Sequence, residues 1–289
     1  MQNNRFLKRK RKDFLRNALM VLSTGLILAL LAGLVGYVLF RGARHISWEF
    51  LSTKPSLVRE TTGILPNLLN TLYIILITLV LVLPLGVGSA VYLNEYAKNQ
   101  KAIRIIELAA ETLAGIPSII YGLAGMLIFV QFFRMGTSLI AGAMTLVIMT
   151  LPTVMRTAQE SLKTVPIGYR EGSLALGAGK WHTIRCVVLP SCIDGIVTGC
   201  ILSVGRIVGE SAALLFTAGM ANEIISPLGA VLPGNAGSTL TVALYMYAKE
   251  RGDFDTAFAI AVILLGLTFL LNTAAKLAAK KLKKGGGEK

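Results

Sequence analysis

Long stretches without any charged side chain constrain this chain more than any other feature. They cover residues 17–40, 61–94, 112–133, 135–155 and 256–275. Each can cross a hydrocarbon layer about 30 Å thick, which takes roughly 20 helical residues. Only 15% of the 289 residues are charged, well below the roughly 25% of a soluble domain. We therefore expect an all-α membrane protein that crosses the bilayer repeatedly.

A further apolar stretch, residues 191–220, differs because it carries Arg206 and Glu210. With it, the sequence predicts six transmembrane helices. A charge at the bilayer centre costs about 2.5 to 3.5 kcal/mol on insertion scales, so these side chains should face the bundle interior or a translocation pathway. Residues four apart lie on one face of a helix, and we expect this pair to do so.

These two charges favour one class of cargo. A planar guanidinium such as that of Arg206 matches an oxyanion. The carboxylate of Glu210 can accept a hydrogen bond from a protonated oxyanion and repels a fully ionised one. Phosphate keeps a proton at neutral pH and sulfate does not, so the pair favours phosphate. The alternative is an ion pair that holds helices together.

The distribution of Lys and Arg orients the helices. Alternate connecting segments hold 21 of the 29 basic residues on one side and 7 on the other, and the remaining one is Arg206. The richer side, with both termini and residues 156–190, is expected to be cytoplasmic. The net charge of +14 therefore indicates topology and contact with membrane lipid, not nucleic-acid binding. On the other side, residues 221–255 form either a docking surface for an external protein or a lid.

A helix break is expected at Gly115, Pro117 and Ser118, inside the stretch at 112–133. Proline lacks the N–H that a helix interior requires. The segment either unwinds and opens backbone groups to a pathway or kinks to allow close packing. The sequence leaves both alternatives open.

Residues 156–190 form a basic loop between two apolar spans. Pro166, Gly177 and Gly179 predict helices over 167–176 and 180–188. The loop resembles the EAA loop of ABC importer permeases, whose spacing it keeps. The matching positions are Glu171, Gly172, Ser173, Gly177, Leu189 and Pro190. The resemblance implies a coupling helix that seats in a groove of a cytoplasmic ATPase.

Three other segments, residues 91–97, 115–122 and 205–218, are similar to the PstA-type permease subunits of bacterial phosphate importers. This resemblance implies a type I ABC importer permease in the cytoplasmic membrane, with both termini in the cytoplasm. It also implies four partners: a homologous PstC-type permease, a PstB-type ATPase dimer, an extracytoplasmic PstS-type phosphate-binding protein and inorganic phosphate.

The chain is not expected to be an enzyme. Leu174 and Trp181 stand where a phosphate-binding loop around Lys180 would need glycine and Ser or Thr, so ATP hydrolysis should belong to a separate subunit. No cofactor or metal is expected. Two rival functions stay open, a permease for another oxyanion such as sulfate or molybdate and a proton-coupled secondary carrier.

The expected organisation has three parts. Residues 1–62 hold a basic tail, the first transmembrane helix and an outer loop. Residues 63–279 form the permease core with its coupling loop at 156–190, and residues 280–289 form a basic cytoplasmic tail.

Overall fold

The computed structural model describes residues 2–56 and 61–286, with side chains over 12–55 and 62–281. In chain order the helices are α1 (Gln2–Gly42), α2 (Trp48–Ser52), α3 (Leu65–Val91), α4 (Gln100–Ala114), α5 (Ser118–Gly125), α6 (Leu139–Thr164), α7 (Ile167–Ala175), α8 (Lys180–Thr183), α9 (Leu189–Ser191), α10 (Ile193–Gly209), α11 (Ala212–Thr217), α12 (Leu240–Tyr245) and α13 (Phe254–Gly286). Most of the basic side chains expected in the N-terminal tail, and those after Lys281, lie outside the described residues.

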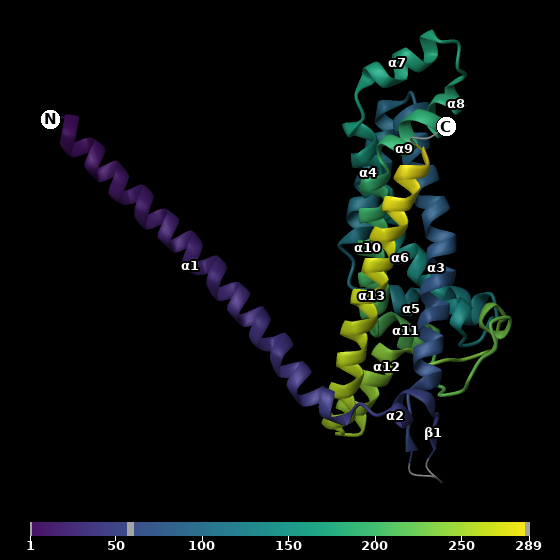
Figure 1. Cartoon of the computed structure of the whole chain (residues 1–289). Helices are drawn as coiled ribbons and strands as arrows, with labels where there is room; N and C mark the ends of the chain where they lie inside the picture. The colour runs from purple at the N-terminus through teal and green to yellow at the C-terminus, as the bar shows by residue number, and fades with distance from the viewer. Residues whose placement is uncertain (1, 57–60, 287–289) are drawn as a thin grey trace.

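Short 3-10 or π-helical segments extend these helices, and two short strands complete the fold. The segments are η1 (Ala43–His45), η2 (Tyr92–Tyr96), η3 (Met126–Phe132), η4 (Ile184–Val188), η5 (Gly229–Val231) and η6 (Met246–Glu250). The strands β1 (Pro55–Ser56) and β2 (Thr61–Thr62) pair antiparallel. They lie with α2 at one end of the bundle, and α7 and α8 lie at the other (Figure 1).

The expected number of membrane spans agrees with the structure. Within the described residues, four helices are long and apolar enough to cross a membrane, namely Lys12–His45, Leu65–Tyr96, Leu139–Thr164 and Phe254–Lys281. Two bent pairs, Gln100–Ala114 with Ser118–Phe132 and Lys180–Ser191 with Ile193–Gly209, pass the same test together. If each bent pair is one span, the total is six.

The main core lies where α3, α6, α10 and α11 meet. It includes Ile74 of α3, Leu146 of α6, Ile207 of α10 and Leu214 of α11, all fully buried. Ser138 caps α6, because its side chain accepts a hydrogen bond from the Ala141 N–H. These helices therefore form the fixed frame against which the shorter segments are placed.

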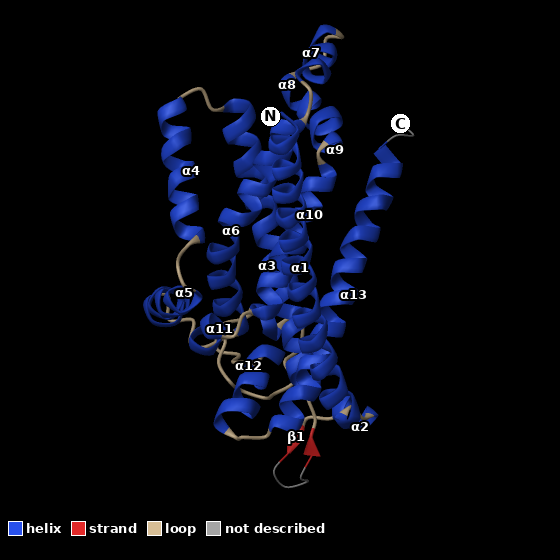
Figure 2. Cartoon of the chain, turned by 90° about the vertical axis from the view of Figure 1, so that its left-hand side faces the viewer, coloured by secondary structure: helices blue, strands red, loops and turns tan. Residues whose placement is uncertain are grey.

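The bounds expected for the third and fourth spans were wrong. The third is a helix pair bent by 100° between Ala114 and Ser118, so that α5 lies across the bundle axis (Figure 2). Its first half, α4, carries charges that the sequence analysis placed outside the span. Arg156 of α6 pairs with Glu111 of α4 at 3.0 Å, so α6 also continues past the charge taken as its limit. The two spans are joined through a turn at Gly136, which has a positive φ of 63°.

The fifth span also differs from the expectation of one continuous helix. It is bent by 68° between Ser191 and Ile193, and α10 ends at Gly209. Glu210 follows in extended conformation, with φ −83° and ψ 118°. Arg206 and Glu210 therefore do not share one helical face, because the helix stops between them.

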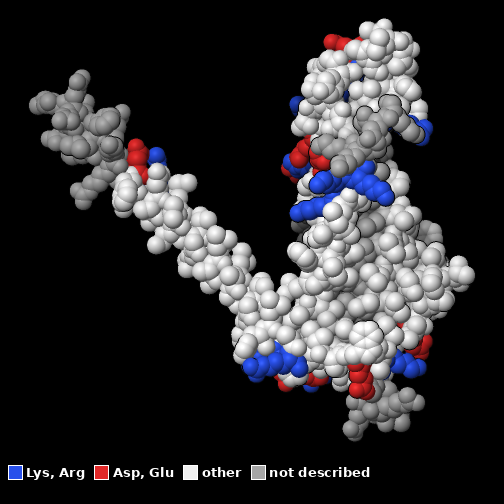
Figure 3. Space-filling model, viewed as in Figure 1, with Lys and Arg blue, Asp and Glu red and all other residues white. Residues whose placement is uncertain are grey.

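Helix α1 leaves the bundle and touches it mainly near its own C-terminal end (Figure 1). There Tyr37 meets Phe258 of α13 edge to face, with ring centroids 5.6 Å apart. Within the described residues, the apolar span of α1 is 0% buried. On the visible face, charged residues gather toward the two ends of the bundle and leave an uncharged belt between them, as a membrane-embedded bundle requires (Figure 3).

Candidate functional site

The loop between α6 and α10 folds into the two helices that the sequence predicts. Pro166 precedes α7, and α8 continues through η4 into the short α9. Gly177 ends the α7 turn with φ +84°, a left-handed conformation that costs glycine little. Its N–H donates to the Leu174 carbonyl at 3.0 Å. The glycine of the motif is therefore needed for the shape of the turn.

The tip of this loop is exposed and largely apolar. Leu176 is 90% exposed, and Ile167 and Trp181 are more than half exposed. Glu171 is also exposed and has no hydrogen-bond or ion-pair partner among the described residues. Large apolar side chains gathered around a free carboxylate are typical of a protein docking surface.

The other motif residues lie on the inner side of the loop. An open groove of about 1270 Å³ separates the loop from the end of α13. It is lined by Gly172, Ser173, Leu189 and Pro190 of the motif together with Ala275, Ala278 and Ala279 of α13. The structure thus brings four motif residues to one groove and leaves Glu171 and Gly177 outside it.

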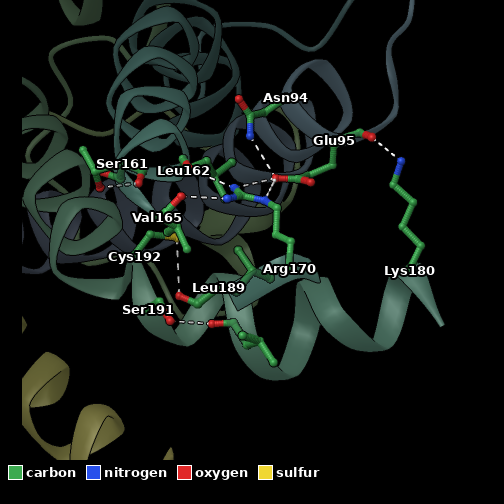
Figure 4. A network of polar contacts seen from close by, with 12 residues as sticks. Asn94, Glu95, Ser161, Leu162, Val165, Arg170, Lys180, Leu189, Ser191 and Cys192 are labelled. Carbon is green, nitrogen blue, oxygen red and sulfur yellow. Dashed lines mark hydrogen bonds and ion pairs between the residues drawn. The ribbon is translucent and has the colours of Figure 1, made fainter. Parts of the chain in front are cut away.

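Polar contacts that the sequence analysis did not predict hold the loop to the bundle (Figure 4). Arg170 of α7 forms an ion pair with Glu95 of η2, with 2.8 Å between Nη2 and Oε1. Glu95 lies in the 91–97 segment and Arg170 directly precedes the motif glutamate. These positions were visible in the sequence, but their contact joins residues 75 apart.

The second candidate region lies where two interrupted spans meet. One interruption separates α4 from α5 at Gly115, Ile116 and Pro117, and the other separates α10 from α11. Ile116 packs against the cluster that contains Ile207 and Leu214. The expected helix break at Gly115, Pro117 and Ser118 is therefore present, with Ser118 as the first residue of α5.

Close packing joins α5 to α11 in this region. A Cβ atom built at Gly122 would lie 2.7 Å from the Cα of Ala213. The Tyr121 hydroxyl spans the first interruption and donates to the Leu113 carbonyl at 2.7 Å. Glycine at 122 therefore allows two backbones to approach more closely than any side chain would permit.

Arg206 is half-buried in the last turn of α10, which ends at Gly209 beside this junction. Among the described residues it has neither an ion-pair partner nor a hydrogen bond to its guanidinium. A half-buried guanidinium without a protein partner keeps its donors free for an anion.

Glu210 is buried, with 8% of the residue exposed. Its Oε1 accepts a hydrogen bond from the Ala213 N–H at 3.0 Å, and its carbonyl accepts one from Thr241 Oγ1 at 2.9 Å. No ion pair joins it to Arg206 among the described residues. The two side chains therefore form no ion pair in this structure, and Glu210 instead accepts a hydrogen bond in the first turn of α11.

The outer ends of the spans are tied together by polar side chains of α3. Asn67 and Asn70 both donate to the Ser238 carbonyl, at 3.2 and 3.3 Å. Thr71 accepts a hydrogen bond from the Leu240 N–H at 2.9 Å. The outer loop and the start of α12 are therefore attached to α3 by side-chain hydrogen bonds.

Comparison with known proteins identifies the family. The model of binding-protein-dependent transport system inner membrane components matches residues 82–284. The chain belongs to this family. This permease is similar to the probable ABC transporter permease protein YqgI of Bacillus subtilis, at 41% identity over 214 residues, which cover 74% of this chain and 73% of that protein. It is also similar to the phosphate transport system permease protein PstA 1 of Mycobacterium tuberculosis, strain H37Rv, at 35% identity over 74% and 68% of the two chains.

Solved structures show the same fold. A chain of a bacterial alginate ABC transporter, in complex with alginate pentasaccharide-bound periplasmic protein, superposes with a TM-score of 0.69 at 12% identity, covering 96% of this chain and 98% of that one. The inward-facing MetNI methionine ABC transporter gives 0.57 at 23% identity, over 78% and 95%. The permease is thus a multi-pass inner-membrane protein with the type I ABC importer fold, and the ATPase of such a transporter is a separate subunit.

Proposed function

We propose that this permease forms half of the translocation pathway of an ATP-driven importer of inorganic phosphate. The observation that carries the proposal is the half-buried guanidinium of Arg206, which has no partner among the described residues and lies beside the junction of two interrupted spans. Similarity to subunits that are named for phosphate transport supports the choice of cargo. Discontinuous helices near a charged side chain are a common way to build a substrate site in a membrane.

Arg206 would bind the anion through its planar set of donors. Glu210 has one carboxylate oxygen engaged by the Ala213 N–H. Its second oxygen has no hydrogen-bond partner among the described residues and would accept a hydrogen bond from a phosphate that keeps a proton. The backbone at Gly115, Pro117 and Ser118 would line the same pathway.

The permease would work within a larger assembly. We infer a homologous PstC-type permease, a PstB-type ATPase dimer and an extracytoplasmic PstS-type phosphate-binding protein as its partners. Both termini and residues 156–190 would lie in the cytoplasm, where the exposed Glu171 and the surrounding apolar side chains would contact the ATPase. ATP-driven closure of the ATPases would move this loop and switch the pathway between its two sides.

Uptake by the complete transporter in proteoliposomes tests the cargo site. Arg206→Ala should lower phosphate uptake roughly tenfold or more, since a hydrogen bond to a charged group contributes about 1.5–3 kcal/mol. Arg206→Lys should retain part of the activity, because it keeps the charge without the planar donor set. Arg44→Ala, which removes an exposed guanidinium at the opposite end of the bundle from α7, is the matched control and should transport normally.

The same vesicles separate the rival functions. Excess sulfate or molybdate should leave phosphate uptake unchanged, and inhibition by either would favour another oxyanion as cargo. Uptake by this chain alone without ATP would favour a proton-coupled carrier. Normal phosphate uptake by Arg206→Ala would contradict the site.

A further inference from the structure

The coupling loop is held to the bundle by a buried polar cluster around Glu95. The Glu95 side chain is 9% exposed and that of Arg170 is 19% exposed, whereas the pair between Arg156 and Glu111 has side chains 58% and 63% exposed. Both Nε and Nη2 of Arg170 donate to Glu95 Oε1, at 3.1 and 2.8 Å. Asn94 donates to the same oxygen at 2.9 Å. One carboxylate oxygen therefore collects three donors.

The same guanidinium also binds the end of α6. Arg170 Nη1 donates to the Val165 carbonyl at 2.8 Å, and Nη2 donates to the Leu162 carbonyl at 2.9 Å. Carbonyls at a helix C-terminus lack partners within the helix, and a cation stabilises them. One side chain of α7 thus joins the cytoplasmic-side ends of α3 and α6, a geometry that the planar donor set of arginine allows and lysine does not.

The second helix of the loop is attached to the same place. Lys180 of α8 donates to the Glu95 carbonyl, and its ammonium lies 4.7 Å from the centre of the Tyr96 ring. Ser173 and Thr183, whose hydroxyl oxygens are 2.9 Å apart, connect α7 to α8. Both arms of the loop therefore converge on η2 (Figure 4).

Helix α7 has little else to hold it. None of its residues is buried, and its neighbours on either side of Arg170, Tyr169 and Glu171, are exposed. Arg170 points toward the bundle while Glu171 belongs to the exposed surface. The helix that would meet the ATPase is therefore fixed to the spans by polar contacts that have a defined geometry, and not by an apolar face.

We propose that Glu95 and Arg170 are positioning residues that make the coupling loop move as one body with α3 and α6. Through this pair, displacement of α7 reaches α3 and α6, which pack against each other and against α10 in the core. The inference rests on the proposed function, in which a motor moves the loop. Without the pair, the ATPase would still dock and hydrolyse ATP, but the displacement of α7 would no longer be transmitted to α3 and α6.

The test uses the complete transporter in proteoliposomes and measures phosphate uptake and ATP hydrolysis together. Arg170→Lys and the double variant Glu95→Gln with Arg170→Met should each lower the phosphate taken up per ATP roughly tenfold, with hydrolysis within about twofold of the unmodified complex. The double variant leaves no unpaired charge, so it should fold and assemble. Arg156→Ala, which breaks an exposed ion pair of the same type, should leave the ratio unchanged.

A second measurement does not depend on the cargo. Spin labels at Tyr92→Cys in η2 and Tyr169→Cys in α7, both exposed positions, report the distance between α3 and the loop in a background without native cysteines. In the otherwise unmodified complex, the distribution of this distance should be narrow and should not change on nucleotide trapping. In Arg170→Lys, nucleotide trapping should broaden the distribution.

The outcomes separate the two hypotheses. An unchanged uptake ratio, or an unchanged distance distribution in Arg170→Lys, would overturn the positioning role. A parallel loss of hydrolysis and assembly in the double variant would also overturn it, because the pair would then only support docking. Absence of phosphate uptake by the unmodified complex would defeat the proposed cargo, and the distance measurement would still decide the role of the pair.

Discussion

At the scale of single residues, the carboxylate of Glu210 has two possible roles, which are to cap a helix and to bind the cargo. Its Oε1 satisfies the Ala213 N–H in the first turn of α11. Glu210→Ala should therefore lower stability by about 1 kcal/mol, as the loss of a helix cap does, and lower the thermal midpoint in detergent by roughly 2–4 °C. Glu210→Gln keeps an oxygen acceptor and should therefore have the same thermal midpoint as the unmodified protein.

Transport by Glu210→Gln then isolates the role of the charge. We expect lower phosphate uptake by this variant with normal stability. Its single amide oxygen remains bonded to the Ala213 N–H, and the NH2 group in place of the second carboxylate oxygen cannot accept a hydrogen bond from a protonated phosphate. Normal uptake by Glu210→Gln would assign Glu210 to capping alone.

At the scale of secondary-structure elements, the contact between α5 and α11 depends on the absence of a side chain at Gly122. An added Cβ would lie 2.7 Å from backbone of Ala213, so Gly122→Ala must push the two helices apart. Overpacking of this kind costs about 1–3 kcal/mol, and thermal unfolding in detergent should show the loss. Gly266→Ala in α13 is the matched control, because nothing lies within 4 Å of a Cβ there, and it should be neutral or slightly stabilising. Equal stability of both variants would mean that α5 and α11 are free to separate.

At the scale of the whole molecule, the two ends of the bundle should lie on opposite sides of the membrane. Cys186 is exposed beside α8, and Trp48 of α2 is 81% exposed at the other end (Figure 1). With Cys192 and Cys200 replaced by serine, a membrane-impermeant maleimide should label Cys186 only in inside-out vesicles. In the same background with Cys186→Ser, Trp48→Cys should be labelled only in right-side-out vesicles. The reverse pattern would contradict the orientation inferred from Lys and Arg.

Local properties made part of this protein predictable. The number of spans follows from the lengths of apolar stretches, because a segment must satisfy its own backbone groups within the membrane whatever its neighbours are. The same holds for the helix break at Pro117 and the helices of the 156–190 loop, since glycine and proline act on their own backbone.

The sequence by itself determined how many segments can cross the membrane and the helix break at Pro117. Only the tertiary structure decided which charges are paired. Arg156 of α6 pairs with Glu111 of α4, and Arg206 has no ion-pair partner among the residues that the structure describes. Arg170 meets Glu95 across 75 residues. Partners of charged side chains depend on the packing of distant elements, and no spacing along the chain encodes that packing.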